Sequence, residues 1–548
     1  MNRKLMMALV FFVGACAQAA DAPSDLESLL SGEEVREHMR ILSSDEFLGR
    51  GPGHPGEDIA ADYIADRFEQ YGLDAPNGSY FQAVPMIGYT TGLSSVQLSF
   101  EGSGGSLLPT YLDDFVLNSG DPEAGVQSGS AEVVFVGYGI NAPETSWDDF
   151  AGVDVRGKFL LILVNDPPAP SDEPDLFGGP AMTYYGRWTY KYEEAARQGA
   201  LGALIVHETE PAGYPWSVVR GGWSGEQFAL PPDPAGARPA GMVGWVTREV
   251  AEGLLALGGH DYSELKAAAA RRGFIAVSTG VTASASLESD VLSVETKNVV
   301  GLLPGSERPD EVVTLTSHYD HFGVGEAIDG DSIYNGAYDN ASGTALLIEM
   351  ARVAAAMDDR PARSVLFIAT AAEEQGLLGA QWYVQSPLYP LSQTVAEVNV
   401  DGANLWGRTT DVTAQGEERS GLGAYVRARA DELGLEIMPD AEPEKGYFFR
   451  SDHFPFAKAG VPALYIGHGR QYVGRPEGWG AGVQEEYTAQ RYHAPSDEYS
   501  EAFTFDGAVQ QGVLALLTLL DIASDDTWPN WHEGQEFKAA RDAMMEGR

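Results

Sequence analysis

Cysteine is almost absent from this chain, which has one, Cys16, among 548 residues. Because a disulfide needs two cysteines, an internal disulfide is excluded. Basic residues are also scarce, with 35 Lys and Arg against 80 Asp and Glu and a formal net charge of −45. That charge disfavours binding to nucleic acid and to anionic membrane surfaces, and it favours attraction of cations.

Long apolar runs are missing except near the N-terminus. Arg3 and Lys4 precede an apolar run at residues 5–13, followed by small residues, which is the pattern of a secretory signal over residues 1–20. We therefore expect an exported protein, periplasmic or secreted. Cys16 ends the sequence VGAC, which resembles a bacterial lipoprotein box, so an outer-membrane lipid anchor and simple cleavage both stay open. Residues after this signal predict no transmembrane span.

The length predicts two or three domains, and the 44% apolar content fits a chain with a sizeable core. Apolar residues at helical spacing predict helices within residues 25–72, interrupted by a glycine-rich loop at residues 48–56. His54 in this loop is interpreted as a turn residue. Strands are expected at residues 80–88 and 96–100.

From about residue 117 the sequence pattern changes to short predicted strands joined by loops rich in Gly, Pro and Trp. Strands are expected at residues 131–139, 157–164 and 203–206, with a helix at residues 190–199. The DVRGK turn and the ARQGALG helix end in this block resemble a protease-associated domain. His207 and His260 stand alone there and are interpreted as structural. The resulting division is 1–20 signal peptide, 21–116 first part of the main domain, 117–287 inserted protease-associated domain, and 288–548 catalytic domain.

Strands and helices alternate strongly after residue 288. Strands are expected at residues 298–303, 312–316, 365–369, 395–400 and 463–466, and helices at residues 343–357, 376–384 and 505–522. This alternation predicts an α/β fold, with a mostly parallel sheet sandwiched between helices and a β-rich α/β insertion.

Two adjacent carboxylates end the most apolar of these strands. Residues 364–376 read SVLFIATAAEEQG, so Glu373 and Glu374 follow a buried strand. Active sites of open α/β sheets lie at the carboxyl ends of the strands. Neighbouring side chains point in different directions, so one acid can hold a metal while the other handles a proton. A solvated acidic turn is the plain alternative for an isolated Glu-Glu pair.

Other strand ends in the same block carry further potential ligands. Residues 317–323 read SHYDHFG, residues 334–343 read YNGAYDNASG, and Asp401 closes the strand at 395–400. His493 lies in RYHAPSDE near the end of the chain. Imidazole and carboxylate ligands without thiolate suit zinc, with Co²⁺ or Mn²⁺ as substitutes. All of these groups at strand ends of one block predict a metal centre.

These motifs resemble the co-catalytic di-zinc exopeptidases, which include bacterial leucyl aminopeptidases, glutamate carboxypeptidase and the transferrin receptor. The shared pattern is His-x-Asp, Asp-x-x-Ser-Gly, Glu-Glu, Asp and a late His, in that order. The resemblance implies the zinc exopeptidase (phosphorylase/hydrolase-like) fold and two Zn²⁺ ions. By the same resemblance, His318 and Asp401 hold one ion, Glu374 and His493 hold the other, and Asp339 bridges them.

The resemblance also implies catalytic roles. Glu373 is the general base for a metal-bridging water, Tyr492 stabilises the oxyanion, and Asp320 hydrogen-bonds His318. Many relatives have an acid where this chain has Tyr338, a departure that leaves the ligand set whole. The Asp339–Asn340 peptide bond is expected to be cis.

Residues 451–456 resemble the stretch that lines the substrate pocket in the family. The expected pocket residues are Arg450, Ser451, Asp452 and Arg491. His321 and His453 are interpreted as residues that support the ligands or are simply hydrogen-bonded. His468 and His532 are interpreted as structural.

The favoured function is an exported aminopeptidase acting on peptides. A carboxypeptidase of the glutamate carboxypeptidase type stays open, because Arg450 and Arg491 flank the motifs and arginines bind carboxylates. Two more functions are compatible with the scaffold, a glutaminyl cyclase-like acyltransferase and a receptor-like binding protein without catalysis. The complete ligand set argues against both of these. No feature of the sequence sets side-chain preference, oligomeric state or the role of the inserted domain.

Overall fold

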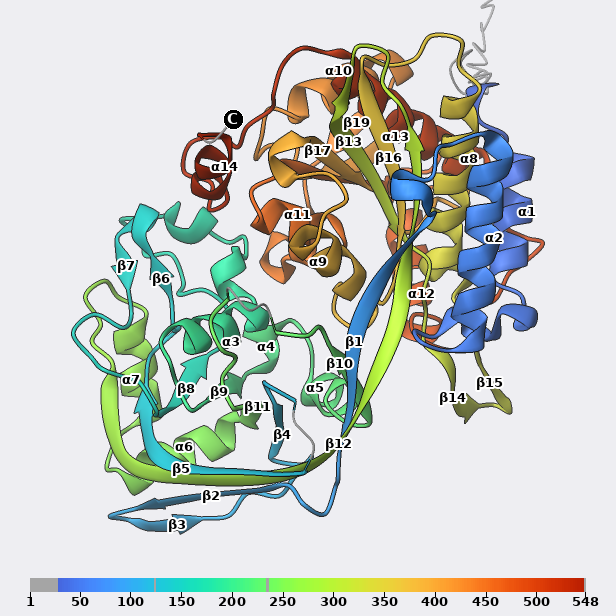
Figure 1. Cartoon of the computed structure of the whole chain (residues 1–548). Coiled ribbons are helices and arrows are strands. Elements are labelled where there is room, and N and C mark those ends of the chain that lie inside the picture. Colours follow the sequence, from blue (N-terminus) through green and yellow to red (C-terminus); the bar gives the residue numbers. More distant parts are fainter. Residues whose placement is uncertain (1–27, 123–124, 233–235, 547–548) are drawn as a thin grey trace, which may run out of the picture.

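The computed structural model describes residues 28–122, 125–232 and 236–546, which form two lobes joined by one long sheet (Figure 1). Within this described chain, residues 28–91 and 289–546 are the large lobe, and residues 92–288 are the small lobe. The strand β12 (Val277–Leu303) runs through both lobes. It pairs antiparallel with β5 (Gly125–Phe135) in the small lobe and with β16 (Arg363–Thr370) in the large lobe.

Only the last part of β12 was predicted from the sequence. In the small lobe its residues alternate between buried and exposed, whereas the final residues, Asn298–Leu303, are all buried. The first part is composed largely of Ser, Thr and Ala, so its hydrophobic alternation is weak in the sequence. The antiparallel partner β1 (Phe81–Thr91), which lies along the middle of β12, was predicted as a strand.

The sheet of the large lobe has the order β19-β18-β20-β17-β13-β16-β12. The parallel strands at its centre are β13 (Arg308–His318), β16, β17 (Thr394–Asn399) and β20 (Ala463–His468). Two further strands, β18 (Asp411–Gln415) and β19 (Glu436–Met438), extend one edge, and β18 runs antiparallel to β20. The expected mostly parallel sheet is confirmed.

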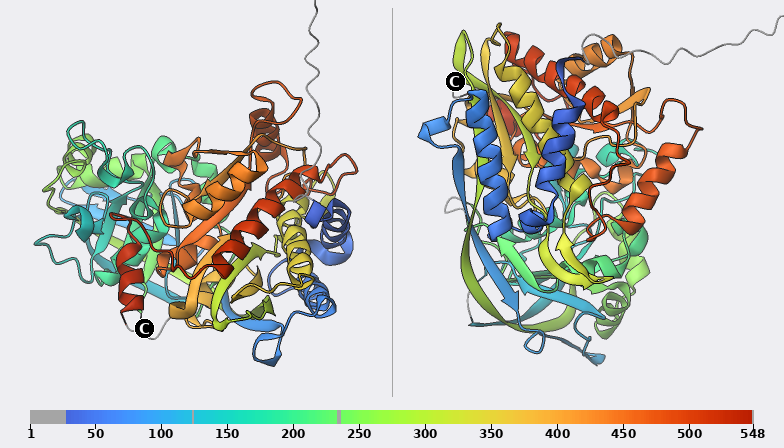
Figure 2. Two further views of the ribbon diagram at one scale, coloured as in Figure 1. Left: turned by 90° about the horizontal axis from the view of Figure 1, so that it is seen from above. Right: turned by 90° about the vertical axis from the view of Figure 1, so that its right-hand side faces the viewer.

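Helices cover both faces of this sheet. One face carries α1 (Gly32–Leu42), α2 (Pro55–Tyr71), α8 (Gly343–Ala355) and α13 (Asp506–Ser524), which lie side by side in Figure 2. The other face carries α9 (Leu378–Gln385) and α11 (His453–Lys458). Successive residues of β16 serve both cores, because Phe367 packs with the first group of helices and Leu366 with the second. Burial on both faces explains the unbroken apolar run of this strand.

The predicted helices and strands of the large lobe are confirmed, with shifts of a few residues at their ends. Several elements were not predicted: β18 and β19, the hairpin of β14 (Gly323–Ile328) and β15 (Asp331–Tyr334), and the helices α10 (Gly423–Leu433), α12 (Trp479–Gln490) and α14 (Lys538–Met545). The hairpin lies beside the predicted metal centre and belongs to its surroundings.

One described helix bears on the expectation that no transmembrane span follows the signal, and that expectation stays a prediction. In the described part of the chain, α13 has the length and composition of a span, but 83% of its apolar window is buried inside the large lobe. This burial fits a core helix, which passes the same test of length and composition. The predicted signal segment and Cys16 lie outside the described residues.

The small lobe contains the other part of the same long sheet. From β5 the order is β8 (Phe159–Leu163), β9 (Gly202–His207), β11 (Met242–Thr247) and β4 (Phe115–Ser119). The first four of these five strands are parallel. Its helices are α3 (Trp188–Arg197), α4 (Thr209–Ala212), α5 (Trp216–Gly222), α6 (Arg248–Leu257) and α7 (Tyr262–Ala269), and its shorter strands are β2 (Gln97–Gly102), β3 (Gly105–Leu107), β6 (Asn141–Ala142), β7 (Trp147–Asp148) and β10 (Glu226–Ala229). Its assignment as a protease-associated domain stays a prediction.

An aromatic cluster joins the lobes away from the long strand. Tyr184 of the small lobe contacts Phe449, Phe454 and Phe537 of the large lobe. The backbone N–H of Met182 donates to the carbonyl of Pro443 over 2.9 Å. The small lobe therefore packs against the segment that leads to the predicted pocket residues 450–452.

Candidate metal centre

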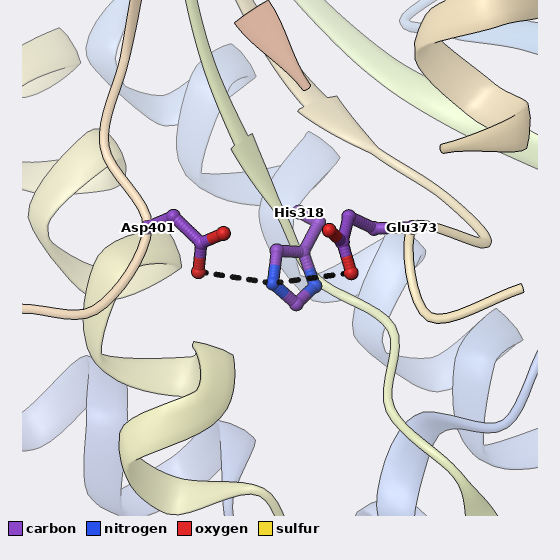
Figure 3. Close-up of side chains that lie close together, drawn as sticks. All are labelled: His318, Glu373 and Asp401. Carbon is purple, nitrogen blue, oxygen red and sulfur yellow. Dashed lines mark hydrogen bonds and ion pairs between the residues drawn. The ribbon is translucent and has the colours of Figure 1, made fainter. Parts of the chain in front are cut away.

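Strand ends bring the predicted ligands together, as the parallel sheet requires. His318 is the last residue of β13, Glu373 and Glu374 follow β16, and Asp401 follows β17. Asp339 lies in the turn Ala337–Ser342 that leads into α8. Figure 3 shows His318 between Asp401 and Glu373. His493, which follows α12, completes the cluster from a distant part of the chain.

Asp339 divides the cluster into two halves. His318 Nε2 lies 3.3 Å from Asp339 Oδ1 and 3.2 Å from Asp401 Oδ1. His493 Nε2 lies 3.5 Å from Asp339 Oδ2 and 3.2 Å from Glu374 Oε2. Ligands bound tetrahedrally to zinc at its usual bond lengths lie about 3.3 Å apart. Both halves therefore have the spacing of zinc ligands, and the two oxygens of Asp339 face different halves.

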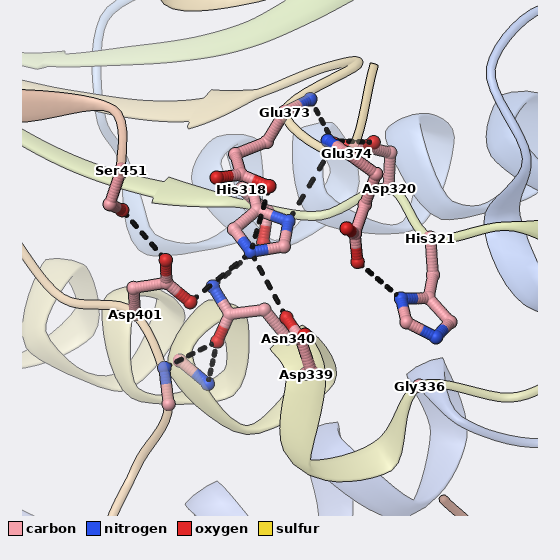
Figure 4. A network of polar contacts seen from close by, with 12 residues as sticks. His318, Asp320, His321, Gly336, Asp339, Asn340, Glu373, Glu374, Asp401 and Ser451 are labelled. Atoms are coloured by element: carbon pink, nitrogen blue, oxygen red, sulfur yellow. Dashed lines mark hydrogen bonds and ion pairs between the residues drawn. The ribbon is translucent and has the colours of Figure 1, made fainter. Parts of the chain in front are cut away.

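His321 is a second histidine near Glu374, and its spacing distinguishes it from His493. Its ring nitrogen and a carboxylate oxygen each from Asp339 and Glu374 form one of two groups with the spacing to hold a metal. However, His321 Nδ1 lies 2.7 Å from Glu374 Oε1, which is a hydrogen-bond distance (Figure 4). A hydrogen bond that orients a ligating carboxylate is the better interpretation, and it agrees with the supporting role expected for His321.

The charge distribution is that of a cation site. Burial disfavours the charged forms, yet His493 lowers the pKa of Glu374 to about 2, and Glu374 with Asp339 raises the pKa of His493 to about 10. Burial likewise opposes charge on His318, but Glu373 and Asp401 raise its pKa well above the ordinary range. The carboxylates thus hold positive charge at both places where the ligand spacing fits zinc.

Glu373 lies near His318, but at a longer distance than the ligand oxygens. Its Oε2 is 3.9 Å from His318 Nε2, farther than the ligand oxygens of Asp339 and Asp401. It also forms a possible metal-holding group with His318 and Asp401. Burial, followed by repulsion from Glu374 and Asp401, raises the pKa of Glu373 well above that of an ordinary carboxyl. A basic carboxylate just outside the ligand spacing fits proton transfer better than ligation.

Asp320 differs from the expectation. Its Oδ1 is 3.7 Å from His318 Nδ1, too far for a hydrogen bond. Instead, Asp320 accepts the backbone N–H groups of Glu373 over 3.0 Å and of Glu374 over 3.3 Å (Figure 4). Asp320 therefore fixes the turn that carries both glutamates, because two consecutive amides at the strand end need an acceptor.

The expected cis peptide bond between Asp339 and Asn340 is present. The Asn340 side chain donates to the carbonyl of His318 over 3.2 Å and accepts the N–H of Gly402 over 2.8 Å. It thereby connects the Asp339 turn with the segments that carry two other ligands. Tyr338 points elsewhere, since its hydroxyl hydrogen-bonds His468 Nε2 over 2.9 Å. This contact agrees with the structural role expected for His468.

The expected pocket residues separate into different environments. Ser451 donates to Asp401 Oδ2 over 2.7 Å and accepts from the amide of Asn399, so it orients a ligand. Asp452 is fully buried and accepts the hydroxyl of Thr370, so the expectation that it lines the substrate pocket was wrong. Burial raises the pKa of Asp452 to about 7.

The two arginines do not contact the ligand cluster. Arg450 donates to the carbonyl of Lys445 over 2.6 Å, and Arg491 lies 3.4 Å from Glu486. Neither forms an ion pair with a ligand carboxylate among the described residues. Both were predicted as pocket residues because they flank the motifs in the sequence. Proximity in sequence does not determine where a long side chain points.

Aromatic residues surround His493 at the edge of the site. Tyr492 stacks on its ring with centroids 3.6 Å apart, and Phe322 packs at 4.6 Å. Tyr492 is 48% exposed, so its ring borders solvent beside the ligands. Burial of the hydroxyl, followed by the charges of Asp339 and Glu374, raises the pKa of Tyr492 well above its usual value. A hydroxyl kept protonated can donate a hydrogen bond.

His453, which the sequence placed among supporting residues, is fully buried and packs between Phe448 and Tyr465. His532 is hydrogen-bonded to the carbonyl of Glu418, and His207 to that of Tyr214. The contacts of His207 and His532 are structural, as expected, whereas His453 has ring contacts and no hydrogen bond to a ligand among the described residues. The residues missed by sequence reasoning are Arg50 and Asp497, both buried behind the cluster. Their positions in the glycine-rich loop and in the motif of His493 were the available signals.

Residues 298–516 match the family model described as Peptidase family M28. A protein named "Probable zinc metalloprotease" from Leptosphaeria maculans is 45% identical over 202 residues, which cover 31% of this chain and 46% of that protein. Aminopeptidase YwaD of Bacillus subtilis is 27% identical over 208 residues, which cover 37% of this chain and 39% of that protein. The chain thus spans less than half the length of these curated relatives.

Among solved structures, the "Aminopeptidase from Aneurinibacillus sp. strain AM-1" aligns with a TM-score of 0.48 at 19% identity, over 91% of this chain and 94% of that chain. The segment that matches the family model, residues 298–516, contains all five residues with zinc-ligand spacing and the Glu373–Glu374 pair. The similarity to Peptidase family M28 therefore covers the whole candidate metal centre.

Proposed function

We propose that this protein is a di-zinc exopeptidase, and specifically an aminopeptidase that removes N-terminal residues from peptides. The observation that carries the proposal is the placement of Asp339, whose two oxygens each lie 3.3–3.5 Å from a different histidine. One carboxylate shared between two histidine-carboxylate pairs is the arrangement that two neighbouring cations need.

The residues present fit zinc. His318, Asp339 and Asp401 would hold one ion, and Asp339, Glu374 and His493 the other. The described part of the cluster offers nitrogen and oxygen donors only, which suits Zn²⁺ and also allows Co²⁺ or Mn²⁺. When bound, two such ions supply positive charge that acidifies water and polarises a carbonyl.

Glu373 is the base in this proposal. Its carboxylate lies at the edge of the cluster, its pKa is raised, and its backbone is fixed by Asp320. It takes a proton from the attacking water and returns that proton to the leaving amine. Tyr492, at the solvent border, donates a hydrogen bond to the oxygen that gains charge.

The choice of the amino end is supported by the relatives named as aminopeptidases and by the side chains around the site. The net charge of −45 and the carboxylates of the cluster attract a substrate amine. Arg491 is paired with Glu486, and Arg450 donates to a backbone carbonyl. Both guanidinium groups therefore have partners within the protein, which argues against their binding the α-carboxylate of a substrate. Export and a protease-associated small lobe are further parts of the proposal, supported by the sequence patterns in residues 1–20 and 117–287.

Paired dipeptides test the proposal. One carries a blocked amine, the other a blocked carboxylate, and each is assayed with and without a chelator. Cleavage that needs the free amine and stops with chelator supports the aminopeptidase. Cleavage that needs the free carboxylate contradicts it in favour of a carboxypeptidase, and zinc binding without any cleavage favours a cyclase or a binding protein.

A further inference from the structure

A fully buried arginine lies behind the metal centre. Arg50, in the glycine-rich loop before α2, has no exposed surface. Its guanidinium donates to four backbone carbonyls: those of Tyr319 (2.7 Å), Leu42 (2.7 Å), Asn335 (2.7 Å) and Gly336 (2.9 Å). Among the described residues, no carboxylate lies within ion-pair distance of it. The guanidinium N–H groups therefore bind backbone carbonyls and no carboxylate.

The backbone that Arg50 holds belongs to two ligand segments. Tyr319 directly follows the ligand His318, and Asn335 and Gly336 begin the segment that ends at Asp339. We call residues 335–339 the Asp339 segment. Burial lowers the pKa of Arg50 to about 10, while Asp320, Asp497 and Asp339 act in the opposite direction. The guanidinium thus stays charged at neutral pH, close enough to the carboxylates of the site to stabilise them.

A buried carboxylate holds the other end of the same segment. Asp497, 1% exposed, accepts the N–H of Tyr338 at 3.1 Å and of Asp339 at 3.1 Å. Its own backbone carbonyl accepts the N–H of Ala337 over 2.9 Å. The hydroxyl of Tyr487 donates to the same side chain over 3.2 Å.

Together these contacts pair one backbone group on each of five consecutive residues, 335 to 339. Arg50 takes the carbonyls of residues 335 and 336, and Asp497 takes the amides of residues 337 to 339. The Asp339 segment precedes α8 and belongs to no strand of the sheet, so these groups have no ladder partner. Buried backbone groups need partners, and here two side chains of opposite charge supply most of them.

The local sequence allows Arg50 to reach this position. Gly49 and Gly51 lie against the base of the β14–β15 hairpin, where a Cβ on Gly49 would collide with the carbonyl oxygens of Tyr334 and Gly323. Arg50 itself has a positive φ of 51°. A non-glycine residue in that region is strained, and such strain persists where the surroundings fix it. The glycine-rich loop thus places the Arg50 side chain against the backbone of the ligand segments.

We propose that Arg50 and Asp497 are a pair of positioning residues that hold the Asp339 segment, and with it the bridging carboxylate, in the geometry that binds two metal ions. The inference rests on the proposed metal function, but neither residue is itself a ligand. Outer partners of this kind commonly change metal affinity by about 10- to 100-fold. Loss of either residue therefore weakens metal binding while all five ligands remain.

Two conservative substitutions test the pair. Arg50→Lys keeps the charge but cannot reach four carbonyls with one compact ammonium group. Asp497→Asn keeps the shape but removes the negative charge and one of the two acceptor oxygens. The N–H groups of Tyr338 and Asp339 and the hydroxyl of Tyr487 must then share a single oxygen. The metal-free proteins are titrated with Zn²⁺ alone against a chromophoric chelator, and the rise in Tm on adding Zn²⁺ is measured in parallel.

Matched controls come from buried residues of the same types elsewhere. Arg363, fully buried at the start of β16, donates to the carbonyls of Ile522 and Asp526 at the end of the strand away from the site. Asp149 of the small lobe is 1% exposed and accepts the N–H of Ile140. Arg363→Lys and Asp149→Asn therefore report loss of packing without loss of positioning at the metal centre.

We expect Arg50→Lys and Asp497→Asn to bind Zn²⁺ at least tenfold more weakly than the wild type, and both controls to bind as the wild type does. If Arg50→Lys does not fold, the zinc affinity of Asp497→Asn alone tests the inference. Zinc binding by both variants as tight as that of the controls overturns the inference and leaves the proposed function intact. A wild-type chain that binds no zinc removes the proposed function, and the inference falls with it.

Discussion

Replacing Glu373 with glutamine separates proton transfer from metal binding. The substitution keeps the size of the side chain and removes its charge and basicity. Because Glu373 lies 3.9 Å from His318, farther than the ligand oxygens, its loss leaves five ligands in place. Its backbone N–H remains bound to Asp320, so the turn that carries Glu374 is expected to persist.

The expected loss of rate follows from the role of a general base. Proton transfer by a positioned side chain contributes roughly 10²- to 10⁴-fold. Glu373→Gln should therefore lower kcat by that factor, which corresponds to about 3–5 kcal/mol in the activation barrier. The value of KM should change little, because the amide occupies the same volume. Both zinc ions should stay bound, because none of the five ligands is replaced.

The assay combines peptide hydrolysis with metal analysis of the same sample. Glu397→Gln is the matched control, since Glu397 is a fully buried glutamate whose burial raises its pKa well above the ordinary range. Glutamine keeps the size of that side chain and an oxygen that can accept the hydroxyl of Thr316. Retained turnover in Glu373→Gln with two zinc ions bound would refute the assignment of the base. Loss of zinc together with turnover would make Glu373 a ligand.

Two further predictions concern metal content and pH. Asp339→Ala should lose zinc from both halves of the site, because one carboxylate faces His318 and His493 alike; two zinc equivalents retained in metal analysis would contradict the bridge. Burial lowers the pKa of His38 to about 4, below the 6.5 of an exposed histidine, so the unfolded chain binds its proton first as pH falls and stability declines from pH 6.5 toward pH 4. The free energy of unfolding, measured with urea at about pH 8 and about pH 5, should fall by about 2 kcal/mol less in His38→Gln than in the wild type. An equal fall in both proteins would refute the lowered pKa of His38.

Much of the large lobe was predictable because its strands are buried on both faces. The run at residues 365–369 is apolar in every position that faces either helix layer, which predicts a central parallel strand. The long strand β12 was only partly predictable, since Ser, Thr and Ala in its first half carry little hydrophobic contrast. The hairpin of β14 and β15 has exposed and half-buried residues throughout most of its length, which leaves no pattern to detect.

Four of the five candidate ligands were predictable because each follows a recognisable strand or precedes a helix, whereas His493 follows α12, which was not predicted. The family resemblance assigned Glu374 as a ligand and Glu373 as the base, and it distinguished His493, as a ligand, from His321, as a supporting residue. Distances of 2.7 Å and 3.2 Å to different oxygens of Glu374 make that distinction in the structure. Asp452 was misplaced because proximity in sequence to Ser451 says nothing about which side chain faces the cluster.

The fold class of the large lobe, the order of the ligand motifs and the identity of the donor atoms can all be inferred from the amino-acid sequence alone. These follow from local properties: apolar periodicity, strand ends and the chemistry of imidazole and carboxylate. Only the tertiary structure decided that Arg50 and Asp497, 447 positions apart by their numbering, hold the same five-residue segment. A buried loop must find partners for its backbone groups wherever the folded chain supplies them, and no local pattern records which distant side chains those are.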